Sequence, residues 1–209
     1  MELNLIILLL ALTLAAALRP WRFLAHGTLA TPILATLTFV PFLWALPSLH
    51  HMALQLQGSA ASLVLLMLGW PLAVPVLALV GVLAWGISPM DGAQALDVTV
   101  WLGIVPATFA LLLGAVLRRL LGPHVFLYIL GRGFLGTAVC VFAARALAQW
   151  LDHRQPGISE DLSLIGHLLL SWGDAFMTGM FTALLVAYKP EWLATWSDRL
   201  YLKPGNKTW

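Results

Sequence analysis

Long apolar stretches, separated by short polar breaks, follow one another along nearly the whole chain. A helix that crosses the hydrocarbon core of a bilayer needs about 20 mostly apolar residues. Seven stretches approach that length, and each predicts a membrane-spanning helix. They are residues 1–18, 27–46, 52–68, 71–86, 98–117, 124–151 and 162–188. The pattern therefore predicts an all-α, polytopic integral membrane helix bundle.

The third and fourth stretches are the hardest to separate, because only Gly69, Trp70 and Pro71 lie between them. A glycine and a proline at such a break can end one helix and begin another. They can equally kink one long helix. The apolar pattern alone leaves both seven spans and six spans open.

The first stretch resembles a secretory signal peptide in its length but not in its charge. A signal peptide carries positive charge before its apolar run. Here the first basic residues, Arg19 and Arg22, come after the run. We therefore expect an uncleaved span whose N-terminus lies outside.

The distribution of Lys and Arg tests this topology, because cytoplasmic loops collect them. With seven spans and an outside N-terminus, eight of the eleven basic residues fall at cytoplasmic ends. They are Arg19, Arg22, Arg118, Arg119, Lys189, Arg199, Lys203 and Lys207. Six spans would put Arg19 and Arg22 opposite Arg118 and Arg119. The charges thus favour seven spans, N-out and C-in, with residues 189–209 as a short cytoplasmic tail.

The composition agrees with the apolar pattern and limits the function. Apolar residues make up 61% of the 209 residues and charged residues 10%, against about 25% charged in a soluble domain. This length predicts a single transmembrane domain over residues 1–209, in contact with membrane lipid. A net charge of +2 is too small to indicate nucleic-acid binding.

A stripe of small residues occurs at every fourth position of the seventh stretch. Small side chains let helices approach closely in lipid, where no hydrophobic drive pulls them together. The stripe therefore predicts a helix–helix seam, either inside the bundle or with a partner subunit. It consists of Ser171, Ala175, Gly179 and Ala183.

Asp174 is the clearest ionisable residue at membrane depth, where such groups are rare and often functional. His167 lies two turns before it on roughly the same helix face, and Arg132 is a candidate partner on the sixth stretch. The group can contact an ion or substrate, or an Asp174–Arg132 pair can lock two helices together. Arg145, in the outer half of the sixth stretch, is expected to extend its charge to the interface.

Adjacent histidines, His50 and His51, precede the third stretch in a predicted outer loop. Imidazole binds zinc, nickel and copper well, although surface polarity explains the pair equally. The chain contains no GxSxG, HExxH, Walker A or CxxC motif. We therefore expect no enzyme activity and no catalytic residues.

Two blocks, residues 58–71 and residues 172–180 with their continuation to Trp192, resemble a proteobacterial branch of CbiM-like energy-coupling-factor transporter permeases. Residues 125–136 share the resemblance. It implies a permease of the bacterial inner membrane that captures nickel or cobalt ions from outside as its substrate. It also implies two kinds of partner, a transmembrane coupling subunit and cytoplasmic ABC ATPases.

The family's metal site is implied to combine the N-terminal amine, a backbone amide, a histidine at position two and a later histidine. This chain has Glu2 at position two, and glutamines stand where the later histidine would fall. Our hypothesis is a different, oxygen-richer site for a divalent ion of the cobalt, nickel and zinc class. It would use Met1, Glu2, His50 and His51, which share the predicted outer face.

Two other functions remain open from the sequence. One is a non-transporting accessory or assembly protein of the membrane, which the departures from the family pattern favour. The other is an ion-coupled carrier that uses Asp174, because proton or sodium coupling needs an intramembrane carboxylate.

Overall fold

The computed structural model describes residues 1–20, 28–49, 57–122, 124–151, 160–197 and 201. The predictions on Arg22, His50, His51, Arg199, Lys203 and Lys207 lie outside these residues. The regular elements are α1 (Glu2–Ala17), α3 (Ala30–Leu49), α4 (Ala61–Leu68), α5 (Trp70–Ile87), α6 (Gly92–Val98), η1 (Thr99–Ile104), α7 (Val105–Leu121), η2 (Leu127–Leu135), α8 (Gly136–Trp150), α9 (Glu160–Tyr188) and η3 (Pro190–Trp192). All are helical, which confirms the all-α bundle over the described part of the chain.

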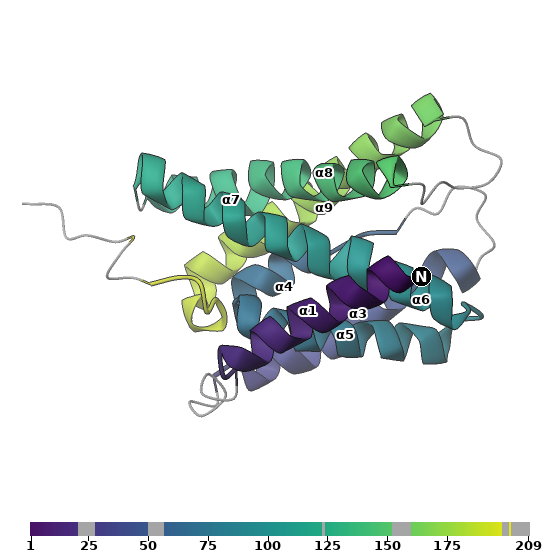
Figure 1. Cartoon of the computed structure of the whole chain (residues 1–209). Helices are drawn as coiled ribbons and strands as arrows, with labels where there is room; N and C mark the ends of the chain where they lie inside the picture. The colour runs from purple at the N-terminus through teal and green to yellow at the C-terminus, as the bar shows by residue number, and fades with distance from the viewer. Residues whose placement is uncertain (21–27, 50–56, 123, 152–159, 198–200, 202–209) are drawn as a thin grey trace, which may run out of the picture.

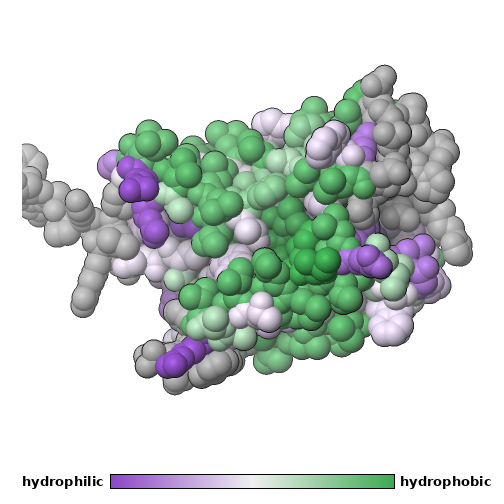
Figure 2. Space-filling model, in the orientation of Figure 1, coloured by the Kyte–Doolittle hydropathy of each residue, from purple (hydrophilic) through white to green (hydrophobic). Residues whose placement is uncertain are grey.

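Within the described residues, five helical stretches are long and apolar enough to cross a membrane. They are Ala30–Leu49, Trp70–Ile87, Gly92–Leu121, Leu127–Trp150 and Leu162–Tyr188. The helix α1 is apolar but shorter, with 16 residues. Large apolar side chains such as Phe39 and Phe126 point outward. The visible face is hydrophobic across its middle, and hydrophilic residues gather toward its two ends (Figure 2). The chain is therefore a membrane protein.

The helices run back and forth between two ends of the bundle, which we call the Met1 end and the Tyr188 end (Figure 1). α1 begins at the Met1 end, and α9 finishes at the Tyr188 end. α7 also finishes at the Tyr188 end, with Arg118 and Arg119 in its last turn. The start of α1 and the finish of α9 thus lie at opposite ends, as an odd number of crossings requires.

The predicted third span, residues 52–68, is wrong as a continuous helix. Residues 57–60 are not helical, and α4 begins only at Ala61. Its eight residues extend about 12 Å, too short to cross a bilayer. Gly69 then turns the chain, with φ +72°, and α5 starts at Trp70. This turn separates α4 from α5, so the two stretches do not form the single kinked helix of the six-span alternative.

Small residues bring α3, α5 and η1 together in the centre of the bundle. All six residues of η1 are buried. A side chain at Gly103 of η1 would come within 2.8 Å of the Trp44 ring on α3. At Gly81 of α5, an added Cβ would overlap the side chain of Thr99. Close helix contact of this kind requires residues without side chains.

The close contact at Gly81 yields a stability prediction. Gly81→Ala forces a methyl group against Thr99, so we expect a loss of about 1–3 kcal/mol in unfolding free energy. The matched control is Gly86→Ala on the same helix, where an added Cβ meets nothing within 4 Å. We expect no loss for this variant. Tryptophan fluorescence during thermal unfolding in detergent measures both, and equal melting temperatures would contradict the close packing.

Candidate functional site

A short non-helical segment, residues 57–60, lies buried in the middle of the bundle. Gln57 is 3% exposed and Ser59 is fully buried. Inside a membrane, backbone N–H and C=O groups outside a helix need partners from the protein itself. The side chains that supply these partners define the candidate site.

Asp174 of α9 holds the start of α4. The Ser59 amide donates to both carboxylate oxygens, at 2.9 and 2.8 Å, and the Ala60 amide also interacts with the carboxylate. Ala60, the residue before α4, has a left-handed backbone with φ 54° and makes no side-chain cap. A carboxylate at a helix N-terminus satisfies free amides and is favoured by the helix dipole. α9 thus supplies acceptors for the two amides that precede α4, while the Ser59 hydroxyl accepts the Ala61 amide at 3.3 Å.

The remaining polar groups of the segment are bonded to three other helices. Gln57 donates its side-chain amide to the Trp44 carbonyl of α3 at 3.1 Å, and the Trp44 indole donates to the Ser59 carbonyl at 3.2 Å. Arg145 of α8 donates to the Gln57 carbonyl. The Ser59 hydroxyl donates to the Leu102 carbonyl of η1 at 2.5 Å. The segment is therefore held by α3, α8, α9 and η1 together.

Arg145 does not reach the interface, contrary to expectation. It is only 6% exposed, and it is the basic side chain that acts electrostatically on Asp174. Arg132 was the predicted candidate for this partner, but the structure does not bring it there. Its guanidinium lies over the Tyr128 ring, 5.3 Å from the centroid. It also packs against Gly114, where an added Cβ would come within 2.5 Å of Nε.

His167 lies on α9, two turns before Asp174, and it feels the positive charge of Arg145. Its Nδ1 atom is buried and has no hydrogen-bond partner among the described residues. Arg145 is the residue of this candidate site that the sequence placed wrongly, at the interface. Its position within an apolar stretch could have indicated a buried role, because charged side chains inside a membrane are rare and usually paired.

The small-residue stripe packs inside the bundle. Ser171 and Ala175 are fully buried. Gly179 faces Phe134 of η2, whose Cβ would be 3.1 Å from an added side chain. Ala183 is half-buried. Of the two interpretations of the stripe, the structure supports the internal seam.

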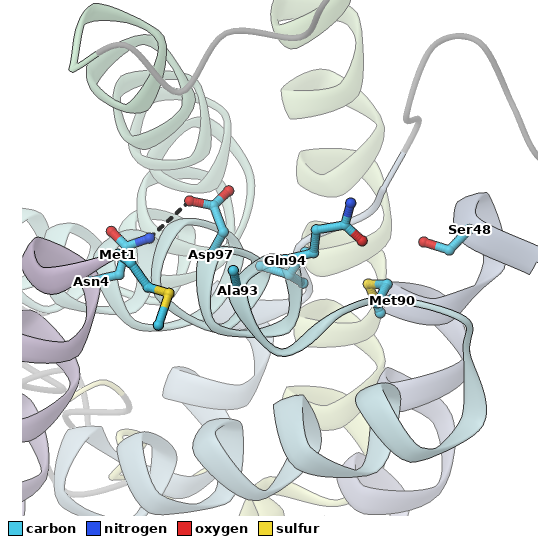
Figure 3. Close-up of a pocket in the computed structure, with 8 residues that line it drawn as sticks. Met1, Asn4, Ser48, Met90, Ala93, Gln94 and Asp97 are labelled. Carbon is cyan, nitrogen blue, oxygen red and sulfur yellow. Dashed lines mark hydrogen bonds between the residues drawn. The ribbon is translucent and has the colours of Figure 1, made fainter.

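A second candidate site is a cavity of about 270 Å³ at the Met1 end (Figure 3). Asn4 of α1 donates to Asp97 of α6 at 2.9 Å and accepts from the Trp101 indole at 3.1 Å. These bonds fasten α1 to the wall of the cavity. The lining consists of Met1, Asn4, Ser48, Met90, Ala93, Gln94, Asp97 and Val98.

Of the predicted metal ligands, the structure brings Met1 to this cavity. Glu2 is exposed and does not line it, while His50 and His51 lie outside the described residues. Within the described ranges, no group of three or more His, Cys, Asp or Glu side chains is placed to hold a metal ion. No family model, curated protein or solved structure matches this chain.

The cap at Ser59 predicts how Asp174 variants behave. Asp174→Ala leaves the Ser59 amide and the Arg145 charge buried without their partner, so we expect a loss of about 3–5 kcal/mol. Asp174→Asn keeps an acceptor oxygen and should lose less. The control is Glu191→Ala, which breaks an exposed pair with Lys189 and should cost at most about 1 kcal/mol.

A double variant separates the charge contribution from the cap. Asp174→Ala combined with Arg145→Met removes both buried charges, so its loss should be smaller than the sum of the two single losses. Thermal unfolding in detergent measures all four proteins. Strict additivity would show that the two charges do not interact.

Proposed function

We propose that this chain is the substrate-capture subunit of an energy-coupling-factor importer for a divalent transition-metal ion. One observation carries this proposal above the others. The bond between Ser59 and Asp174 joins the two sequence blocks that resemble the transporter family, residues 58–71 and 172–180. The residues that carry the resemblance therefore form one buried contact in this chain.

The discontinuous third crossing favours transport over a purely structural role. Non-helical backbone at membrane depth is tolerated only where protein buries it or where it lines a cavity. Transporters place such broken helices beside their substrate path. Residues 57–60 have this character, since they are buried at the meeting point of four helical elements.

The cavity at the Met1 end is the proposed capture site. Its lining offers the Asp97 carboxylate, the side-chain amides of Asn4 and Gln94, and the thioethers of Met1 and Met90. Oxygen donors suit divalent cations, and thioethers suit softer ones. We propose that this end faces outward from a bacterial inner membrane and receives an ion of the cobalt, nickel and zinc class.

Energy for transport would come from other proteins, since this sequence carries no nucleotide-binding motif. We propose a transmembrane coupling subunit and cytoplasmic ABC ATPases as partners. An ion-coupled carrier would need Asp174 to bind and release its ion. Both oxygens of that carboxylate already accept a hydrogen bond from the Ser59 amide. This favours a substrate-capture subunit over an ion-coupled carrier that works alone.

The proposal predicts metal binding that depends on Asp97. Purified protein titrated with cobalt, nickel and zinc should bind about one ion, and Asp97→Asn should weaken binding about 10- to 100-fold. Asparagine keeps an acceptor for Asn4, so the fold should survive. The control is Asp91→Asn, which alters a carboxylate outside the lining and preserves the cap of α6.

The predicted histidine ligands form a separate arm of this experiment. His50→Ala/His51→Ala should weaken binding if these side chains add to the site. Failure of the wild-type protein to bind any of the three metals at micromolar concentration would contradict metal capture and favour the accessory-protein alternative. Equal loss in the Asp97 and Asp91 variants would place the site elsewhere.

A further inference from the structure

The C-terminal part of the chain holds α4 at both of its ends. Asp174 accepts from the amides of the two residues just before its first turn. At the other end, the Ala194 amide donates to the Met67 carbonyl at 2.9 Å. The amide and hydroxyl of Thr195 both donate to the Leu66 carbonyl, at 3.3 and 2.9 Å. The last carbonyls of a helix lack partners within it, so residues 193–197, here the C-terminal strap, complete α4.

Aromatic packing fastens the C-terminal strap to η2. The Tyr128 hydroxyl lies 2.7 Å from the Thr195 hydroxyl. The Tyr128 ring meets Trp196 and Tyr201 edge-on, at centroid distances of 4.9 and 5.1 Å. Trp196 and Tyr201 stack on each other at 4.6 Å. Since Tyr128 is fully buried, these contacts anchor the strap to the core at the Tyr188 end.

A continuous set of contacts leads from the strap to the cavity. Thr195 bonds the end of α4, and the start of α4 follows Ser59. The segment 57–60 donates one hydrogen bond to Trp44 and accepts another from it. Trp44 lies one helical turn before Ser48, which lines the cavity. Each step joins described residues through hydrogen bonds or a single helix.

α4 is suited to move as one rigid piece. Its eight residues are separated from α5 by the turn at Gly69 and are preceded by the non-helical residues 57–60. Its ends are held by bonds from distant residues rather than by continuous helix. Seven of its eight residues are also buried, so a displacement at one end is carried along the rigid helix to its other end.

We infer that the C-terminal strap transmits events at the Tyr188 end to the cavity at the Met1 end, with α4 as the moving element. The inference rests on the proposed function only for the identity of the ligand that binds in the cavity. The coupling itself is a property of this chain and can be measured without metal or partner.

Hydrogen–deuterium exchange of the full chain in nanodiscs tests the inference. Thr195→Val removes the hydroxyl that joins Leu66 to Tyr128 while keeping the side-chain shape. We expect amide exchange to rise at least about fivefold in peptides covering residues 57–68 and in those covering residues 44–49. Thr38→Val is the control, since its hydroxyl bonds only within α3, to the Leu34 carbonyl at 2.9 Å.

Faster exchange confined to residues 189–201 would overturn the inference, because the strap would then loosen without affecting α4. An equal response in the Thr38 control would overturn it too. Should Thr195→Val fail to fold, Tyr128→Phe removes one hydroxyl and keeps the ring, and should give a smaller change at the same residues. These measurements need no metal, so their failure is distinct from a failed metal titration.

Discussion

A bilayer offers no hydrogen bonds to the backbone, so residues 57–60 depend on the carboxylate of Asp174. Two bonds from the Ser59 amide let α4 begin in the middle of the bundle. Without them, the amides just before this buried helix of eight residues would face an apolar core without acceptors. The discontinuous crossing and the site around it both depend on this contact.

Other elements bury that contact and place a positive charge near the Asp174 carboxylate. Arg145 from α8 balances the carboxylate and reaches the Gln57 carbonyl. Trp44 from α3 fills the space beside it with an indole that also donates a bond. The glycines at positions 81 and 103 let α5 and α3 approach η1 closely. Electrostatics and close packing therefore serve one buried polar centre.

The sequence predicted the all-α membrane bundle because apolar length directly reflects bilayer thickness. It did not predict the start of α4, since hydropathy does not distinguish extended from helical backbone when both are buried. Asp174 stood out as an intramembrane charge, but its partner depended on which turn of the sixth stretch meets Asp174 on α9, and that register placed Arg145 there rather than Arg132. The cavity was missed because Asn4 and Asp97 look like ordinary interfacial polar residues.

The long sequence separation between α4 and its caps has a consequence for biosynthesis. Ser59 and Asp174 are 115 residues apart, and Thr195 lies 129 residues from Leu66. Residues 57–60 therefore leave the ribosome long before Asp174 and Arg145 exist. We expect this segment to reach its final hydrogen bonds only after α9 has been inserted, so that folding near the start of the chain waits for a helix near its end.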